Sequence, residues 1–399
     1  MSWQQVQLGE VADIISGATP KSTVPDFWGG EIAWATPTDL SNLKAKHIAS
    51  TERRITDTGL KSCAARLLPP NSVLFSSRAP IGLVAINKTP MATNQGFKSF
   101  VPSADLNADY LYWWLVANKQ QIQDLGNGAT FKEVSKGIVS KVKIPLPPVD
   151  EQSRIAAILD KADAIRRKRQ QALALAEDFH KSMFLEMFGD ELFDQDKASY
   201  RSIADLIDDG SIVGMQDGNH GEIHPKLKDF STSGTPFVAA NMIRTGRLIT
   251  NGAHHLQDIW LKKLRIGFAK PRDVLLSHKG SIGFVAIVGA DTPQLILSPQ
   301  VTYYRTNQQK IIPEYLAAYF RSGVFQAELE KFSKQSTRAY VGITRQKSLH
   351  IVVPETRKQK KFCEVVSKLE AAIPTLKAST DQADILFASL SRRAFRGEL

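Results

Sequence analysis

The chain has 399 residues, which is enough for two or three domains of ordinary size. It carries 51 Lys and Arg against 40 Asp and Glu, a net charge of +11, and 43% of its residues are hydrophobic. This composition is that of a folded protein and excludes a chain that is disordered throughout. No stretch approaches the roughly 18 consecutive apolar residues of a membrane-spanning helix, so no membrane partner is expected.

The first residues and the cysteines bear on the compartment. The opening MSWQQ has neither a basic leader nor an apolar segment, so we expect no secretory signal. Cys63 and Cys363 are too few for a disulfide framework or a zinc site. We therefore expect a soluble, cytoplasmic protein with no metal on this chain. The basic excess fits a polyanion such as DNA and fits equally well lysines that only promote solubility.

An internal repeat is the strongest feature of the sequence. Residues 70–86, PNSVLFSSRAPIGLVAI, match residues 271–287, PRDVLLSHKGSIGFVAI, at 9 of 17 positions, where chance would give about one. Residues 109–111 (DYL) then match 314–316 (EYL), and 144–152 (IPLPPVDEQ) match 351–359 (IVVPETRKQ). The chain is therefore predicted to be a tandem duplication of a unit of about 200 residues.

Each copy has the same predicted order of elements. Short apolar runs between Pro, Gly and Asn come first and predict short strands. A connector that contains proline follows, and after it comes a long amphipathic helix. The predicted fold class is α+β, with a mixed α/β domain and a long helix occurring twice. The predicted segments are 1–148 (first mixed domain), 149–190 (first long helix), 191–354 (second mixed domain) and 355–399 (second long helix).

The two long helices are predicted to pack on each other. From Gln152 to Phe188 and from Gln359 to Phe395 each helix has 37 residues, roughly 55 Å. Their apolar stripes must be buried, and chain order favours an antiparallel, coiled-coil-like rod with pseudo-two-fold symmetry. Pro374 is expected to kink or interrupt the second helix. The predicted stripes comprise Ile155, Leu159, Ala162, Ile165, Ala172, Ala176, Phe179, Met183 and Met187, then Phe362, Val366, Leu369, Ile373, Leu376, Ala383, Leu386, Leu390 and Phe395.

Known catalytic motifs are absent from the sequence. There is no G-x-x-x-x-G-K-[ST] nucleotide loop, and residues 126–132, GNGATFK, resemble one only superficially. There is no G-x-S-x-G elbow and no H-E-x-x-H pair. No glycine fingerprint for S-adenosylmethionine occurs, and the pair His254 and His255 has no nearby Cys or carboxylate at metal-ligand spacing. We therefore expect a chain without catalytic residues.

Polar loop residues recur at the same place in both copies. Ser76, Ser77 and Arg78 follow a predicted strand in the first copy, as residues 277–279 (SHK) do in the second. Such side chains on a rigid scaffold can bind phosphates or base edges, although shared ancestry alone would also explain the recurrence. Amides of Asn94, Gln95 and Gln300 lie near the next strand, where they suit adenine or simply form turns.

Other basic residues have less specific patterns. Lys132 and Arg338 lie close to a threonine in each copy, at Thr130 and Thr337. The runs 166–169 (RRKR) and 357–361 (RKQKK) are predicted to be solvated helix faces that could line DNA phosphates in a complex.

These motifs, in this order, resemble the specificity subunits of type I restriction-modification enzymes over essentially the whole chain. The resemblance includes residues 8–11 (LGEV), 15–20 (ISGATP), 28–34 (WGGEIAW), the two repeated loops and the ending AFRGEL. The second copy departs from the first at 217–221, DGNHG, where a Gly-Thr-Pro pattern is expected, and this departure suggests a different half-site.

The resemblance implies a non-catalytic subunit that recognises double-stranded DNA. Two target recognition domains would each contact one half of a bipartite, asymmetric site. The helices would set the separation and dock two methylation subunits, and restriction or translocation subunits would join them. Adenine N6 methylation, and ATP-dependent cleavage, would occur on those other chains, which would carry S-adenosylmethionine, ATP and Mg. The residues predicted to contact DNA are Thr19, Lys21, Ser77, Arg78, Asn94, Gln95, Thr130, Lys132, His220, Asn241, Arg244, His278, Lys279, Gln300 and Arg338.

Two other functions stay open at this point. A stand-alone DNA-binding or architectural protein would lack methylase genes nearby and methylase subunits on purification. An enzyme with an unfamiliar site would methylate or cleave DNA as an isolated chain.

Overall fold

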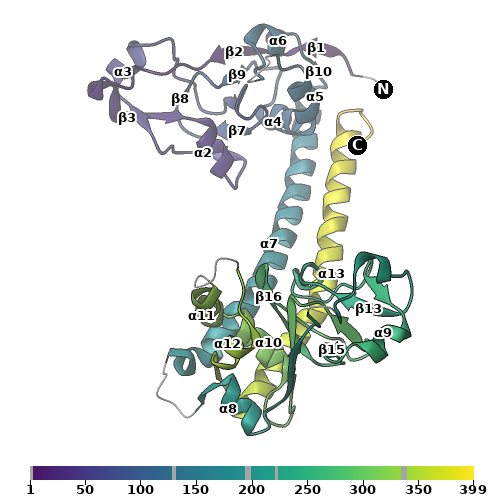
Figure 1. Cartoon of the computed structure of the whole chain (residues 1–399). Helices are drawn as coiled ribbons and strands as arrows, with labels where there is room; N and C mark the ends of the chain where they lie inside the picture. The colour runs from purple at the N-terminus through teal and green to yellow at the C-terminus, as the bar shows by residue number, and fades with distance from the viewer. Residues whose placement is uncertain (1–2, 128–131, 194–198, 221–222, 334–338) are drawn as a thin grey trace. The chain divides into compact units, whose positions relative to one another are not determined.

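The computed structural model describes residues 3–127, 132–193, 199–220, 223–333 and 339–399. The chain divides into two compact units. The first unit consists of residues 1–172 and 376–399, and the second of residues 173–375. The path of the chain through each unit can be followed by colour in Figure 1.

The first unit is a mixed α/β structure in which the strands form two sheets and a separate pair. Among its described residues the larger sheet has the order β2-β9-β6-β7-β4, the smaller one β5-β3-β8, and β1 pairs with β10. The strands are β1 (Gln5–Gln7), β2 (Ala12–Ser16), β3 (Trp28–Ala35), β4 (His47–Ile48), β5 (Arg54–Ile55), β6 (Val73–Phe75), β7 (Val84–Asn87), β8 (Met91–Thr93), β9 (Lys98–Pro102) and β10 (Lys143–Pro145). The helices are α1 (Leu8–Val11), η1 (Pro25–Phe27), α2 (Pro37–Asn42), α3 (Asp57–Lys61), α4 (Ala108–Ala117), α5 (Lys119–Asp124), α6 (Lys136–Ser140) and α7 (Val149–Phe193), which continues into the second unit.

The second unit has the corresponding sheets. Among its described residues their orders are β12-β19-β16-β17 and β14-β13-β18-β15, and β11 pairs with β20. The strands are β11 (Tyr200–Ser202), β12 (Ile212–Asp217), β13 (Thr235–Val238), β14 (His254–Leu256), β15 (Phe268–Ala269), β16 (Val274–Lys279), β17 (Ser281–Ile287), β18 (Leu295–Leu297), β19 (Val301–Thr306) and β20 (His350–Val352). The helices are α8 (Ile203–Asp208), η3 (Leu227–Asp229), η4 (Ala240–Ile243), α9 (Asp258–Lys263), α10 (Pro313–Arg321), α11 (Gly323–Ser333), α12 (Ile343–Lys347) and α13 (Thr356–Ala394), which continues into the first unit.

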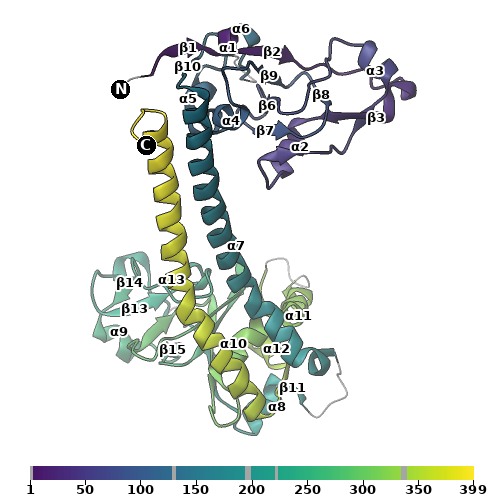
Figure 2. The ribbon, with the colours of Figure 1, turned by 180° about the vertical axis from the view of Figure 1, so that it is seen from behind.

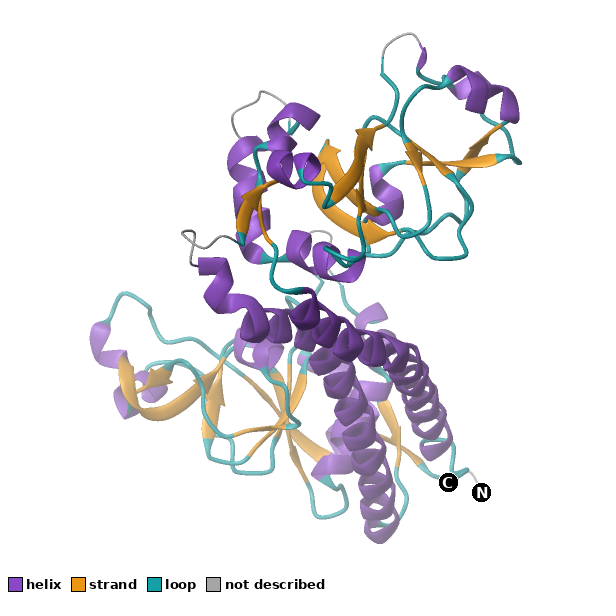
Figure 3. Cartoon of the chain, turned by 90° about the horizontal axis from the view of Figure 1, so that it is seen from below, coloured by secondary structure: helices purple, strands orange, loops and turns teal. Residues whose placement is uncertain are grey.

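The two units share one topology, so the predicted tandem duplication and the α+β class are confirmed. The order β2-β9-β6-β7 in the first unit repeats as β12-β19-β16-β17 in the second. In both units the smaller sheet contains a parallel pair, β3 with β8 and β13 with β18. Figure 3, coloured by secondary structure, shows the strands of each unit flanked by short helices.

One helix of each unit connects the sheet to the long helices. In the first unit α4 places Tyr110 and Leu111 in the same core as Ile155 of α7 and Ala394 of α13. Figures 1 and 2, which view the ribbon from opposite sides, both show α4 against the start of α7. In the second unit α10 has the equivalent position, and its Tyr315 packs on Phe188 of α7 with ring centroids 4.9 Å apart.

The antiparallel pairing of the long helices is confirmed within each unit. In the first unit the beginning of α7 shares a core with the end of α13, including Leu159 and Phe387. In the second unit the end of α7 shares a core with the beginning of α13, where the ring centroids of Phe188 and Phe362 lie 5.4 Å apart. The two helices therefore run in opposite directions in both units.

The predicted apolar stripe is only partly correct. Ile155, Leu159 and Met183 are buried, whereas Ile165, Phe179 and Leu386 are about half exposed, and Ala172 is exposed. A helix with one helical neighbour buries a narrow seam, and it buries a wider face only where a domain also covers it. The prediction missed the buried residues Ala156, Phe184, Phe188 and Leu192.

The expected interruption at Pro374 does not occur. Helix α13 is continuous from Thr356 to Ala394 with Pro374 inside it. A proline removes one backbone donor from the helix, and the turns on either side keep their own hydrogen bonds.

Candidate nucleic-acid interface

A buried serine shapes the loop that follows the central strand of each unit. The Oγ of Ser76, after β6, accepts a hydrogen bond from the Leu83 N–H at 2.8 Å and donates one to the Pro80 carbonyl at 2.7 Å. The Oγ of Ser277, in β16, accepts from the Phe284 N–H at 2.9 Å. The serine at each position thus fixes the loop to the strand that follows, which explains its recurrence in the repeat.

In the first unit Ser77, the residue after Ser76, connects three loops that lie far apart in the sequence. The Ser77 N–H donates to the Gly96 carbonyl at 2.7 Å, and the Val134 N–H donates to the Ser77 carbonyl at 3.0 Å. The loop after β6 is thereby joined to the loop after β8 and to the segment before α6. We call this arrangement the three-loop junction.

The second unit contains the same three-loop junction. The His278 N–H donates to the Gln300 carbonyl at 2.9 Å, and the Val341 N–H donates to the His278 carbonyl at 2.9 Å. The segments brought together in the first unit are those that the sequence pointed to separately, around residues 78, 95 and 132, and in the second unit those around residues 279 and 300 are joined to the segment at Val341.

A fourth loop reaches the junction through a glycine in each unit. A Cβ atom on Gly17, directly after β2, would clash with the carbonyl oxygen of Asn94. A Cβ atom on Gly218, directly after β12, would clash with the carbonyl oxygen of Leu297. The two glycines permit the same close approach of backbone. The second copy therefore matches the first at this glycine, although its following residues differ.

The predicted residues of the first unit lie around its junction. Thr19 and Gln95 are exposed and joined by a hydrogen bond between their side chains, and Lys21 and Lys132 are exposed. One acceptor of the Asn94 side chain is occupied within the loop, because its Oδ1 accepts a hydrogen bond from the Gly96 N–H at 2.9 Å.

Arg78 has an acidic neighbour that sequence reasoning missed. Its Nη1 lies 3.8 Å from Oε2 of Glu133, and Nζ of Lys98 lies 3.2 Å from Oε1 of the same carboxylate. Arg78 is about one-third exposed, so its guanidinium is held near Glu133 and remains accessible.

The predicted residues of the second unit surround its junction in a similar way. Lys279 is exposed, with Nζ 5.8 Å from the centroid of the Tyr340 ring. Gln300 and Asn241 are exposed, and Oε1 of Gln300 lies 3.5 Å from the N–H of Ala240, the residue before Asn241. Arg244 is exposed with its guanidinium 5.8 Å from the Phe284 ring.

Ser77 and His278 differ from the expectation of exposed loop side chains, because both are completely buried. Nδ1 of His278 lies 2.7 Å from Oγ1 of Thr302, and its Nε2 has no hydrogen-bond partner among the residues that the structure describes. Burial lowers the pKa of His278 to about 4, against the opposing attraction of the Asp217 carboxylate. The imidazole is therefore neutral at neutral pH, and neither side chain presents a polar atom at the surface.

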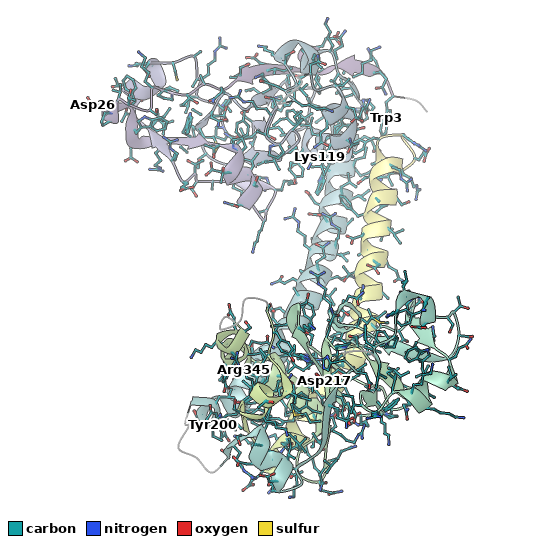
Figure 4. All side chains as sticks on the ribbon, viewed as in Figure 1. Trp3, Asp26, Lys119, Tyr200, Asp217 and Arg345 are labelled. Carbon is teal, nitrogen blue, oxygen red and sulfur yellow. The ribbon has the colours of Figure 1, made fainter. Side chains whose placement is uncertain are left out.

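Asp217 is a second residue that was missed. Its carboxylate is buried, and its Oδ2 lies 2.8 Å from Nε2 of His220 and 3.8 Å from Nε2 of His278. Asp217, labelled in Figure 4, ends strand β12. The Asp-x-x-His spacing of residues 217–220 was the available signal, since it permits a hydrogen bond across a short turn.

Thr130 and Arg338 lie outside the described residues. Among the described residues, no helix combines the length and the apolar content needed to cross a membrane. No group of three or more His, Cys, Asp or Glu side chains in that part of the chain could hold a metal ion.

The basic run 166–169 is only partly the solvated face that was predicted, because Lys168 and Arg169 are exposed whereas Arg166 and Arg167 are half-buried. Arg166 and Arg167 both pair with Asp163, each at 2.5 Å, and the guanidinium of Arg166 also lies 4.5 Å from the Phe387 ring. Nη1 of Arg169 donates to the Ser379 carbonyl at 3.0 Å. Arg166 and Arg169 thus join α7 to α13 within the first unit, whereas Arg167 donates a hydrogen bond to the Lys44 carbonyl.

Comparison with known proteins gives the family. The profile described as "Type I restriction modification DNA specificity domain" matches residues 1–175 and 221–383. The chain belongs to this family. Specificity subunits of this family are not the catalytic chains.

Relatives with the same description occur in archaea and bacteria. The MjaIX specificity subunit of Methanocaldococcus jannaschii is 28% identical over 292 residues, which is 70% of this chain and 66% of the relative. The MjaVIII specificity subunit of the same organism is 20% identical over 96% of this chain and 89% of its own length. The EcoR124I/EcoR124II specificity subunit of Escherichia coli is 27% identical, and the match covers 47% of each chain. The match thus spans about two thirds of the length of the MjaIX subunit and about half of that of the EcoR124I/EcoR124II subunit.

Solved structures show the same fold. A chain from a study of complex assembly and conformational transition of the type I restriction-modification system has a TM-score of 0.61 at 16% identity, covering 100% of this chain and 98% of its own. The S subunit of a type I system from M. genitalium has a TM-score of 0.58 at 12% identity, covering 98% and 96%.

Proposed function

We propose that this specificity subunit recognises a bipartite, asymmetric DNA site, with one half contacted by each unit. The observation that supports this is the three-loop junction, which occurs in both units with the same backbone hydrogen bonds and different side chains. A conserved scaffold with different side chains suits two different half-sites. The relatives and solved structures named above are type I specificity subunits or chains of type I systems, which favours this function over a stand-alone architectural protein.

The side chains at corresponding places differ in the contacts that they offer to DNA. Arg78 in the first unit can donate two parallel hydrogen bonds to O6 and N7 of guanine from a planar guanidinium, whereas the three N–H donors of Lys279 in the second share one ammonium nitrogen. Thr19 after Gly17 corresponds to His220 after Gly218. Lys21 and Lys132 add charge next to the first junction, where phosphate contacts would fix the register.

Ser77 and His278 are proposed to position these residues rather than to contact DNA. Their buried side chains and their backbone hydrogen bonds fix the loops that carry Arg78 and Lys279. In the same way, buried Asp217 holds Nε2 of His220 and leaves Nδ1 as the ring nitrogen available to a ligand.

The partner subunits are proposed to dock on the long helices. The helices carry exposed apolar side chains in both units, a feature that often marks a protein interface. They are Ile165, Ile385 and Leu386 in the first unit and Leu175, Phe179 and Leu185 in the second. Two methylation subunits would bind there, and restriction subunits would join the complex. S-adenosylmethionine, ATP and Mg would be held by those chains, with the methyl group transferred to adenine N6.

The division into target recognition domains at 1–148 and 191–354 and spacer helices at 149–190 and 355–399 stays a proposal. It is supported by the two long helices, which the structure has at Val149–Phe193 and Thr356–Ala394. Under this division the helices separate the two DNA-contacting domains and set the gap between the half-sites.

Selection from random DNA tests the proposed function. The full chain assembled with its methylation subunits is incubated with a library of random duplexes, and the bound fraction is sequenced. We expect two short fixed blocks separated by a gap of constant length and variable sequence. One continuous block, or no enrichment above random sequence, would contradict the proposal.

A further inference from the structure

A large groove lies in the first unit, outside the candidate DNA interface. Its volume is about 1300 Å³. Its walls come from α4, α5, the α6 region, β10 and the last turns of α13, and they combine apolar and polar side chains. The main apolar side chains are Trp114, Ile138, Val142, Phe387 and Phe395. Among the described residues that line it, every charged side chain is basic, namely Lys141, Lys143, Arg392 and Arg396.

The second unit shows what fills the corresponding place. Residues of the two long helices correspond at an offset of 207, so Ser391 of α13 corresponds to Phe184 of α7. Phe184 is only 3% exposed, and its ring centroid lies 6.0 Å from that of Tyr315 and 6.3 Å from that of Tyr319. The second unit therefore fills with its own aromatic ring a position where the first unit has a serine.

The neighbouring contacts show that the helix packing itself is equivalent. The ring centroids of Phe395 and Tyr110 lie 5.4 Å apart in the first unit. Those of the corresponding Phe188 and Tyr315 lie 4.9 Å apart in the second. Because this aromatic pair is preserved, the helices pack alike here, and the absent ring at position 391 leaves space in the first unit that Phe184 fills in the second.

The charge beside the missing ring also differs between the units. Arg392 and Arg396 correspond to Leu185 and Gly189 of the second unit. The first unit thus combines an unfilled aromatic position with a basic border that its counterpart lacks.

We propose that this groove binds a segment of another protein that inserts an aromatic side chain beside Trp114 and Ser391 and carries acidic residues opposite the basic border. The charge of the border selects an acidic partner, and the apolar side chains of its walls favour a protein side chain over the phosphate backbone of DNA. The proposal stands apart from DNA recognition, since the residues that carry it, Trp114, Ser391, Arg392 and Arg396, are not among those predicted to contact DNA.

A peptide-binding experiment tests this proposal. The probe is a short fluorescein-labelled peptide rich in glutamate, with leucines and one central phenylalanine, titrated with the full chain and followed by fluorescence anisotropy. Two control peptides replace the phenylalanine by serine or every glutamate by lysine. The protein variants are Ser391→Phe, which fills the groove, and Arg392→Glu with Arg396→Glu, which reverses its charge. Lys228→Glu, at an exposed site of the second unit, is the matched control.

We expect the acidic aromatic peptide to bind the unchanged chain and the Lys228→Glu variant with the same affinity. Its affinity for both groove variants should be lower by about tenfold or more. Both control peptides should bind poorly to the unchanged chain. If the Ser391→Phe variant does not fold, the variant with Arg392→Glu and Arg396→Glu alone tests the proposal. Equal binding to all proteins, or no binding at all, would overturn the proposal. Loss of random-duplex binding in the charge-reversed variant, without any peptide binding, would assign the groove to DNA instead.

Discussion

At the scale of single residues, Asp217 and His220 provide the most specific test of how a junction presents a side chain. The buried carboxylate of Asp217 lies 2.8 Å from Nε2 of His220, which fixes one ring nitrogen and the orientation of the ring. If His220 contacts a base, Asp217 acts on that contact only through His220.

Replacing these residues should affect one half-site. We predict that His220→Ala lowers discrimination at one base pair of the second half-site by about 1–3 kcal/mol, and that Asp217→Asn lowers it by less. The measurement is competition binding with duplexes that differ at single base pairs. In the double variant, Asp217→Asn should add nothing to His220→Ala. If Asp217→Asn lowers discrimination as much in the His220→Ala background as in the unchanged chain, Asp217 has a general structural role instead.

His278 makes the stability of the second unit depend on pH. Its pKa is lowered from 6.5 to about 4 in the folded chain, mainly by burial, so the unfolded chain binds more protons between these values. The folded state should therefore lose up to about 3 kcal/mol as the pH falls from 6.5 through 4. Denaturant unfolding at pH 7 and pH 4.5 measures this loss. The loss should be smaller in His278→Gln, and an equal loss in both proteins would contradict this assignment.

The burial of Ser77 and His278 shows what the sequence could not predict at this scale. The repeat placed both residues in equivalent loops, and this placement is correct. Their burial depends on Val134 and Val341, which arrive from segments more than 50 residues later, and no local pattern reveals such packing.

At the scale of elements, a buried glutamine fixes the start of each long helix. Oε1 of Gln152 accepts from the Asn107 N–H at 2.8 Å, and its Nε2 donates to the carbonyls of Asp105 and Pro147. Gln359 makes the same set of bonds with Ile312, Lys310 and Pro354. Each glutamine therefore joins its long helix to the loop that precedes α4 or α10.

Removing either glutamine should destabilise the chain. Gln152→Ala leaves one N–H and two carbonyls without partners in a buried place, so we predict a loss of about 3 kcal/mol of unfolding free energy. Gln359→Ala should cost about the same, because its hydrogen bonds are equivalent. Thermal unfolding followed by circular dichroism measures the change, with the exposed Gln120→Ala as control. A melting temperature equal to that of the control would refute the role of these bonds.

The same two glutamines show how far the repeat could predict elements. Their offset of 207 gave the helix register correctly, and Phe188 and Phe395 take equivalent positions. The exposure of Ile165 and Phe179 was missed, because periodicity identifies an apolar face but not how many neighbours cover it.

At the scale of the whole molecule, the proposed role of the long helices is to set the distance between two DNA-contacting domains. Within the first unit, Arg169 of α7 contacts Ser379 of α13, so these parts of the two helices face each other. A change in length must therefore be made in both helices to preserve their packing.

Matched insertions should lengthen the gap between the half-sites. Four residues added near Ala172 and four near Ser379 extend each helix by about 6 Å and nearly preserve its apolar seam. This equals about two base pairs at 3.4 Å per step. We predict a gap longer by about two base pairs with both half-sites unchanged, measured by the selection from random duplexes. An unchanged gap would show that the helices do not set the spacing.

Whether each unit contacts its own half of the site can be seen most directly in the methylated sequence in cells. Genomic methylation is mapped by single-molecule sequencing in cells that express the chain, its Arg78→Ala variant or its Lys279→Ala variant together with the methylation subunits. We predict a bipartite motif that becomes degenerate in one half with Arg78→Ala and in the other half with Lys279→Ala. A motif altered in the same half by both variants, or in neither half by either variant, would contradict it.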